Sequence, residues 1–281
     1  MAFNFAVPAV IAQVNDLGGV EYTAFLNADN DPDISFLKVS ANIPTKIGDR
    51  GHYILNGIGY TNVSIDFKTE YSFDTAELGN FHIIEYTFGY TFPMNTRWRF
   101  TAQLNPAIAS NLRASLGFDD LAINGSIIFI RSLEGPKKNR LTLGLAYSQT
   151  SGIPFPLPFI TYFREITQNL SYTIGVPITK FKYYLGRRRN SVEGFLRLSG
   201  FFSNLSNPVA VNGQEATAIN LSGIVAGIGY DRYIGKRFNL FFKAGYFFRD
   251  QLQLNDENRD EIFDFNLSDT FYTRGGFQFN F

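Results

Sequence analysis

Residues 269–281 read "DTFYTRGGFQFNF", and the pattern of this stretch decides the class of fold. Phe277, Phe279 and Phe281 alternate there with glycine, glutamine and asparagine. Successive side chains of a β-strand point to opposite faces, so a strand of this sequence has one aromatic face and one polar face. If the rest of the chain repeats the pattern, the protein is a sheet with one apolar and one polar surface.

The same alternation recurs along the whole chain. In 140–148, "RLTLGLAYS", leucine and tyrosine alternate with arginine, threonine, glycine, alanine and serine, and 82–92, 97–105 and 238–249 behave alike. Each stretch has a period of two over about ten residues, which predicts β-strands, and no comparable stretch has the helical period of 3.6. The predicted strands are 20–27, 34–43, 52–63, 80–92, 97–105, 121–132, 140–149, 155–163, 169–176, 178–185, 191–202, 219–232, 238–249 and 270–281.

These segments make about fourteen strands, and about twelve remain possible if some short segments fold inward. The division at Val176-Pro177 keeps the number even. The connections between strands fall into two sets that largely alternate, as expected for up-and-down strands between two unlike ends. The short set is 45–51, 93–96, 134–139, 164–169, 186–190 and 233–237, and the long, polar set is 27–33, 64–79, 106–120, 203–218 and 250–269.

Composition narrows the function classes. The 281 residues carry 25 basic and 25 acidic side chains, which argues against nucleic acid as a partner. The absence of cysteine excludes disulfides, thiolate metal sites and cysteine nucleophiles. The uncharged stretch 141–163 is interrupted by "SQTSG" and three prolines, so it predicts two strands and a turn rather than a transmembrane helix.

An apolar face that repeats along the chain can point to a soluble core or to lipid. Three features favour lipid: polar faces rich in Gly, Ser, Thr, Asn and Gln, strands of about ten residues, and connections that are short at one end and long at the other. Closure of the sheet also removes edges that aggregate. We therefore predict an all-β fold, a single closed antiparallel up-and-down transmembrane β-barrel over residues 20–281.

Residues 1–19 are expected to form a separate N-terminal segment. "MAFNFAVPAVIAQ" is apolar, and Val10-Ile11-Ala12 is a small-residue pattern like a secretory cleavage site, but a basic region before it is missing. The segment is either the remnant of a signal peptide or part of the mature protein. If it is retained, it is a candidate plug for the barrel.

The last eleven residues, "FYTRGGFQFNF", resemble the terminal strand of bacterial outer-membrane β-barrels, which end on Phe after alternating aromatics. The resemblance implies an outer-membrane location with both termini in the periplasm, and contact with membrane lipid and lipopolysaccharide. It also implies that the barrel-assembly machinery captures this strand by strand addition. The wider chain, with "SGIPFPLPF" and "LSYTIGVP", resembles an uncharacterised outer-membrane barrel family of Bacteroidota. The implied assembly signal consists of Phe271, Phe277, Phe279 and Phe281.

Enzymatic and metal sites are weakly represented. The two histidines, His52 and His82, begin strands at opposite ends of the predicted barrel, so they cannot share a site. His82 is expected to face outward at the outer rim, where a neighbouring serine would be needed for a lipid-modifying enzyme, a distant alternative. The acidic sequence at 29–33 lacks the Gly and Glu of an EF-hand, and the acidic residues of 250–269 are typical of a solvated loop. We predict no catalytic residues, no metal and no cofactor.

The parity of the strands also predicts which charged side chains face the lumen. Eight are basic and three are acidic, an excess that favours anions in a water-filled pore. Alternatively, Arg and Glu pair across the lumen and close it, and Phe241 and Phe247 on the same face indicate a partly apolar interior. The predicted lumen charges are Lys38, Glu85, Arg97, Arg99, Arg140, Glu193, Arg197, Asp231, Lys243, Arg249 and Arg274.

These observations rank two functions. The first is a channel or transporter for a small solute. The second is a barrel that serves as a subunit or scaffold of a larger outer-membrane complex. Nothing in the sequence names a substrate.

Overall fold

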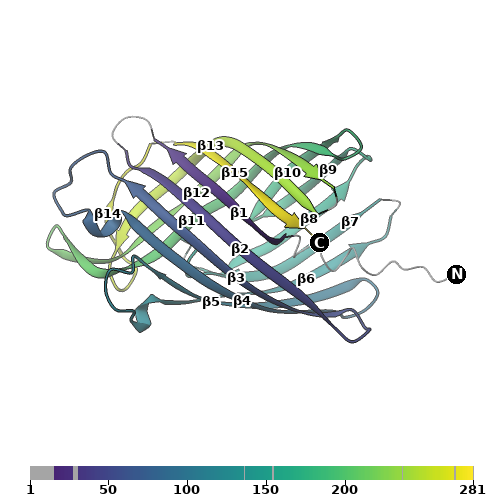
Figure 1. Ribbon diagram of the computed structural model, residues 1–281, viewed down its shortest axis with the longest axis horizontal. Coiled ribbons are helices and arrows are strands. Elements are labelled where there is room, and N and C mark those ends of the chain that lie inside the picture. Colours follow the sequence, from purple (N-terminus) through teal and green to yellow (C-terminus); the bar gives the residue numbers. More distant parts are fainter. Residues whose placement is uncertain are drawn as a thin grey trace.

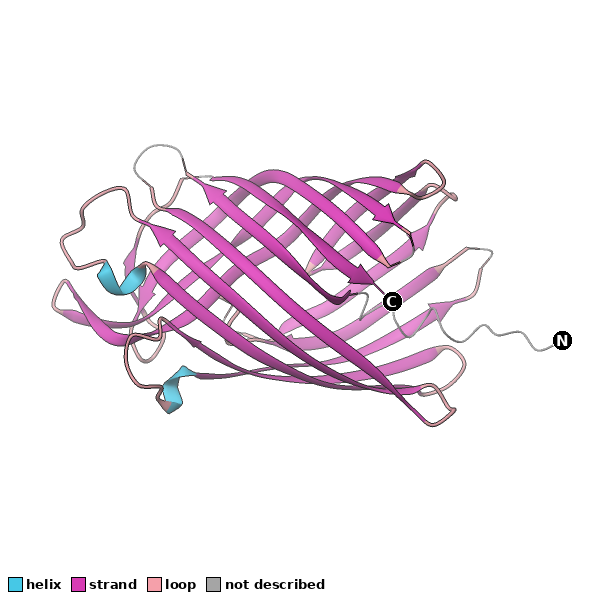
Figure 2. Cartoon of the chain, in the orientation of Figure 1, coloured by secondary structure: helices cyan, strands magenta, loops and turns pink. Residues whose placement is uncertain are grey.

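The computed structural model describes residues 16–27, 31–135, 137–153, 155–235, 237–268 and 270–280, with the backbone alone for residues 16, 249 and 250. The chain forms one large sheet that closes into a barrel (Figure 1). Two single-turn 3₁₀ helices, η1 (Ala76–Leu78) and η2 (Phe118–Asp120), lie among the loops at one end (Figure 2). The strands are β1 (Asp16–Leu26), β2 (Asp33–Ile47), β3 (His52–Asp66), β4 (Asn80–Pro93), β5 (Trp98–Ser110), β6 (Leu121–Leu133), β7 (Asn139–Tyr147), β8 (Leu157–Glu165), β9 (Leu170–Val176), β10 (Ile178–Leu185), β11 (Asn190–Val211), β12 (Gln214–Ile234), β13 (Phe238–Asn255), β14 (Glu261–Asp264) and β15 (Thr270–Asn280).

The predicted closed barrel is confirmed. Each strand pairs antiparallel with its neighbour in sequence, β13 pairs with β15, and β1 closes the ring by pairing with β15 as well as with β2. The short β14 pairs only with β13, within the last long connection. Without β14, the wall has the fourteen strands that the alternation predicted, and Pro177 separates β9 from β10.

The outer surface of the barrel is apolar around the whole ring. Every one of the wall strands exposes at least one large hydrophobic side chain on its outward face, as a surface that contacts lipid requires. Among the residues that the structure describes, no helix is long and apolar enough to span a membrane. Outward side chains on successive strands include Tyr22, Val39, Ile58, Phe88, Leu104, Ile127, Leu145, Ile160, Ile174, Phe181, Leu196, Ile228, Phe242 and Phe279.

The two ends of the barrel differ. The β2–β3, β4–β5, β6–β7, β8–β9, β10–β11 and β12–β13 turns are short and lie at the end where β1 begins and β15 ends (Figure 1). The opposite, long-loop end holds the β3–β4, β5–β6 and β13–β15 connections. The β9–β10 connection at this end consists of Pro177 alone, so the wall is low there.

Residues 203–218 correct the sequence prediction. They were expected to form a long polar loop, but they extend β11 and β12 as a hairpin beyond the rest of the wall. Asn212 and Gly213 form its two-residue turn with positive φ angles of 52° and 83°, which Asn-Gly adopts at little cost. The first strand also starts at Asp16, four residues earlier than the predicted barrel boundary at residue 20.

The barrel narrows toward the long-loop end because β7 to β10 are short. Pro156 and Pro177 lack a backbone N–H donor and stand where β8 begins and where β9 gives way to β10. Beyond this low wall, β11 has no full neighbouring strand on one side, and single residues of other segments pair with its backbone instead. Leu198 N donates to Pro177 O at 3.3 Å, Phe202 N donates to Thr150 O at 3.1 Å, and Asn204 pairs in parallel with Ser110 of β5.

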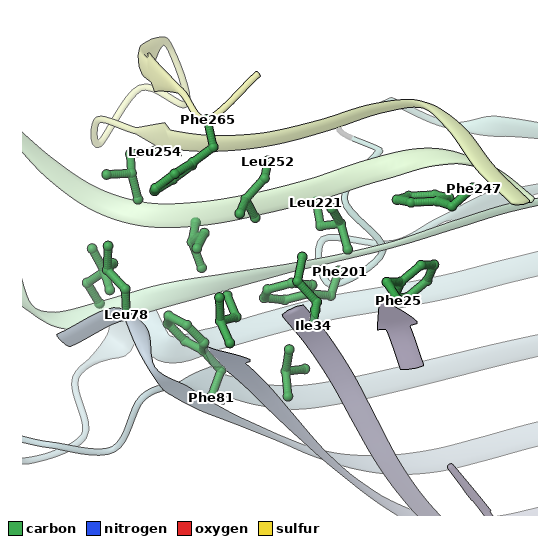
Figure 3. Packing of buried hydrophobic residues seen from close by; sticks show 14 of the residues in the cluster. Phe25, Ile34, Leu78, Phe81, Phe201, Leu221, Phe247, Leu252, Leu254 and Phe265 are labelled. Atoms are coloured by element: carbon green, nitrogen blue, oxygen red, sulfur yellow. The ribbon is translucent and has the colours of Figure 1, made fainter. Parts of the chain in front are cut away.

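The narrowed half of the barrel has an apolar core instead of a lumen. Buried side chains from β1–β4 and η1 pack against side chains from β11–β13 on the opposite wall, and we call this group the apolar closure (Figure 3). Ring centroids of Phe36 and Phe201 are 5.6 Å apart across the interior, and those of Phe81 and Phe201 are 5.9 Å apart. Barrels of about eight strands are filled by their side chains, and the narrowed ring approaches that size.

Candidate functional site: a charged cavity beneath the apolar closure

A cavity of about 210 Å³ lies in the interior where the wide and narrow halves of the barrel meet. Its lining comes from β1–β4 and β15 on one side and from β11 and Thr150 on the other. In the lining, the apolar residues of these strands lie toward the long-loop end, and most of the polar residues lie toward the short-turn end. The alternation of inward positions along the strands thus gives the cavity an apolar roof and a charged floor.

The roof is the lower surface of the apolar closure. It consists of Phe25, Phe36, Ile83 and Phe201, with Tyr272 beside them. Phe25 and Tyr272 have ring centroids 5.5 Å apart, and Phe25 also contacts Phe36 in an edge-to-face arrangement at 5.7 Å. The rings are therefore held by one another as well as by the wall.

The floor carries three cations, Lys38, Arg197 and Arg274, and two carboxylates, Glu21 and Glu85. Arg274 Nη2 donates to Glu21 Oε2 and forms an ion pair with it. Glu85 Oε2 accepts a hydrogen bond from Asn124 Nδ2 at 3.3 Å. Lys38 is exposed although it faces the interior, so the floor is hydrated. Four of these five residues were predicted to line the lumen, and Glu21 was missed.

Arg197 differs from the other charged residues of the floor. It is half-buried, and its Nε donates only to the backbone oxygen of Leu198, at 3.4 Å. Within the described part of the chain, no carboxylate lies within ion-pair distance of its guanidinium. The floor therefore has one positive charge more than its carboxylates balance.

A second charged group lies nearer the short-turn end. Lys182 Nζ is 3.3 Å from Glu193 Oε2 and 2.9 Å from Asp231 Oδ2, and Lys243 Nζ is 2.5 Å from Glu193 Oε1. Glu193, Asp231 and Lys243 are on the predicted lumen list. Lys180 and Lys182 were missed, although their alternation with Phe181 and Tyr183 in β10 contains the required signal.

Three of the remaining predicted lumen charges, Arg97, Arg99 and Arg140, lie apart from the cavity. Arg97 lies on the rim rather than on the lumen wall because it falls in the β4–β5 turn, where it pairs with the exposed Glu134. Arg99 Nη1 donates to Gly51 O at 3.2 Å, and the Arg140 guanidinium lies 5.3 Å from the ring centre of Phe163. The side chain of Arg249 lies outside the described residues.

Both histidines lie on the outer wall and form hydrogen bonds with tyrosine hydroxyls. His52 Nδ1 lies 2.6 Å from Tyr90 Oη, and His82 Nδ1 lies 2.8 Å from Tyr60 Oη. The register places Ser110 opposite His82, a neighbour that the sequence analysis did not identify. However, Ser110 is fully buried and its Oγ lies 3.2 Å from Ser206 Oγ. The hydrogen bonds found among the described residues do not join Ser110 to His82, so this pair is not arranged as a nucleophile and its base.

The described phenylalanines of the C-terminal strand lie on the outward face of the barrel, and the last acidic loop forms hydrogen bonds within itself. Phe271 and Phe279 are exposed on the outward face of β15 and Phe277 shares their parity, while Phe281 lies outside the described residues. In the loop, Asp256 Oδ1 accepts hydrogen bonds from the backbone of Asn258 and Asp260. Over the described ranges, no three acidic or histidine side chains are grouped closely enough to hold a metal ion.

Comparisons with solved structures find other barrels at low similarity. The β domain of the Bordetella autotransporter BrkA is 14% identical, with a TM-score of 0.35, and the match covers 95% of this chain and 100% of that one. Outer membrane phospholipase A from Escherichia coli is 13% identical, with a TM-score of 0.37 and coverage of 96% and 97%. A deletion mutant of the monoaromatic hydrocarbon channel TodX is 9% identical, with a TM-score of 0.40 and coverage of 98% and 93%.

No curated protein matches the chain in sequence. One family model does match, and it covers residues 29–280, which is almost the whole barrel from the first connection to the end of β15. The chain therefore belongs to the family described as a domain of unknown function, DUF6268.

Proposed function

We propose that this protein is an outer-membrane barrel that passes a small solute through its interior and is closed at its outer end at rest. The observation that carries the proposal is the cavity of about 210 Å³ beneath the apolar closure, whose floor is charged and hydrated. A wall that only supported other subunits would not need an interior space lined by Lys38, Arg197 and Arg274. The excess of positive charge favours an anionic solute.

The proposed orientation puts the long-loop end outside the cell and both termini in the periplasm. Lipid and lipopolysaccharide would contact the outward apolar side chains, since charged groups are rare on that surface. The aromatic face of β15, with Phe271, Phe277 and Phe279, would together with Phe281 be the segment that the barrel-assembly machinery recognises.

Opening requires one wall of the closure to move, and the seam between β11 and β5 is a place where few backbone contacts hold the wall together. A single backbone pair, Asn204 with Ser110, joins these strands. Polar contacts also hold the extension to β5 and to the loops beside it. Ser110 Oγ lies 3.2 Å from Ser206 Oγ, Ser206 N donates to Asn111 Oδ1 at 2.9 Å, and Arg113 N donates to Ser206 Oγ at 3.1 Å. Asn207 Nδ2 donates to Glu77 Oε1 of η1 at 3.2 Å. We therefore propose that the β11–β12 extension separates from β5 when the solute passes.

The test uses a disulfide, because the chain has no cysteine of its own. Ser110→Cys combined with Ser206→Cys places two thiols where the hydroxyl oxygens are now 3.2 Å apart, so the sulfurs must approach to about 2.05 Å for a disulfide to form. In proteoliposomes, we expect the reduced variant and the cysteine-free parent to release a labelled small anion. We expect oxidation to stop release from the variant alone, and a reductant to restore it.

Two results would contradict the proposal. If folded parent protein and folded reduced variant both release no more anion than empty liposomes, the barrel is not a transport route. If the oxidised variant still releases anion at the parent's rate, the route exists but does not open at the β11–β5 seam.

A scaffold role is the second candidate, and the apolar closure itself favours it because a sealed barrel conducts nothing. In that case, extraction of the native membrane in mild detergent should yield the barrel with stoichiometric partners. Extraction of the bare chain alone would speak against this role.

A further inference from the structure

We infer that the luminal cavity binds a small monocarboxylate that carries a single apolar ring, with the carboxylate on Arg197 and the ring under the aromatic roof. This inference rests on the proposed use of the interior as a solute route, and it adds the chemical class of the solute. Three independent properties of the cavity support it: its charge, its apolar surface and its size.

The charge of the floor requires an anion. Arg274 is neutralised by Glu21, whereas Arg197 has no carboxylate within reach among the described residues. A guanidinium that has lost part of its hydration without gaining a counter-ion is unfavourable. A carboxylate ligand would supply that counter-ion, and the fork of Arg donors matches its two oxygens.

The roof requires an apolar group on the same ligand. The accessible part of the roof comes mainly from Phe36 and Ile83, because Phe25 and Phe201 are each only 1% exposed. A fully polar anion would leave Phe36 and Ile83 in contact with water, whereas a ring in the ligand would cover them and pack edge-to-face or offset against Phe36. The ligand is therefore amphipathic, with its charge at one end.

The size accommodates a ligand with one ring. An apolar cavity of about 150 Å³ accommodates benzene. The present cavity of about 210 Å³ leaves room for one such ring and a carboxylate. Benzoate has this size and polarity, and it is the probe that we choose.

Gly59 provides a way to fill the cavity without disturbing the wall. A Cβ atom built on Gly59 would meet only Glu85 Cβ, at 4.0 Å, and its φ angle is not in the left-handed region. Gly59→Val therefore adds an isopropyl group to the cavity. Gly194 lies on the outward face of β11 and has no atom within 4 Å of the added Cβ, so Gly194→Val is the matched control.

The experiment is calorimetric titration of the folded full-length barrel in detergent. We expect benzoate to bind, and benzyl alcohol (the ring without the charge) and acetate (the charge without the ring) to bind at least tenfold more weakly. Arg197→Gln and Gly59→Val should each weaken benzoate binding at least tenfold, and Arg197→Lys should restore part of it. Gly194→Val and Lys46→Gln, which removes an exposed charge near the end of β2, should leave benzoate binding unchanged.

The inference is overturned if benzoate does not bind to the wild-type barrel, or if Arg197→Gln and Gly59→Val bind it as tightly as the wild type does. Equal binding of benzyl alcohol would also overturn it, because the charge would then have no role. The binding results can be distinguished from the results of the anion-release test. Redox-controlled flux without benzoate binding would leave the proposed function standing and reject only the ligand class.

Discussion

Glu193 carries its charge inside the barrel on a side chain that is only 1% exposed. Lys182 of the neighbouring strand β10 lies close to one of its oxygens. Lys243 of β13, which is separated from β11 by β12, lies close to the other. A buried carboxylate is tolerated only when it is paired in this way, because the cost of removing it from water is several kcal/mol. At the scale of the residue, Glu193, Asp231 and Glu21 are thus compensated by cations, whereas Arg197 has no carboxylate within ion-pair distance among the described residues.

Glu193→Gln should lower the free energy of unfolding by about 3 kcal/mol, because it leaves Lys243 without its carboxylate and Lys182 with Asp231 alone. The measurement is the urea midpoint of the shift in gel mobility between folded and unfolded barrel. Glu134→Gln is the control, since its pair with Arg97 is exposed and such pairs contribute at most about 1 kcal/mol. Equal midpoints for the two variants would show that the inner pair is not stabilising.

The β11–β12 extension decides the shape of the outer half at the scale of the element. Val209, Val211 and Ala216 point inward from it and are buried, whereas the turn at Asn212-Gly213 is exposed. The Asn-Gly pair and the alternation around it indicate a hairpin, yet the many polar residues of 203–218 resemble a loop. Whether this segment forms a hairpin or a loop depends on whether its apolar side chains have something to pack against. In the structure they pack against the β1–β4 wall.

Val211→Asp should loosen this extension, because a carboxylate would replace a side chain with no exposed surface. We expect a loss of about 3 kcal/mol in stability and faster hydrogen exchange of amides in 203–220 than in the wild type. Asn212→Asp, one residue along and exposed at the turn, should change neither quantity. Unchanged exchange in Val211→Asp would mean that the extension is not held by the closure.

Over most of the barrel, the apolar side chains face outward, whereas in a soluble protein they face the core. Ile228, on the outward face of β12, is 73% exposed, and exposed apolar side chains of this kind surround the barrel. The same structure has a conventional apolar core at the long-loop end. The molecule therefore combines a lipid-facing apolar surface with an inward apolar closure, and the charged cavity lies at the border between polar and apolar interior.

Ile228→Arg should impair folding into lipid vesicles, since an arginine facing the middle of a bilayer costs about 2–4 kcal/mol in a membrane barrel. The folded fraction after refolding into vesicles, measured by gel mobility, should fall clearly below that of the wild type. Asn212→Arg, at the exposed turn of the extension, serves as control and should refold normally. Equal folding of the two variants would contradict a lipid-facing position for Ile228.

The sequence alone determined the fold class, the number of wall strands and the direction of most side chains, because a period of two is a local property that each strand carries by itself. Even the division at Pro177 followed from the need for an even number of strands. Only the tertiary structure decided that β11 passes over the low wall of β7–β10 to meet β5, and that Phe36 and Phe201 close the interior. Those contacts join residues from opposite walls, and alternation along one strand says nothing about how far away the opposite wall lies.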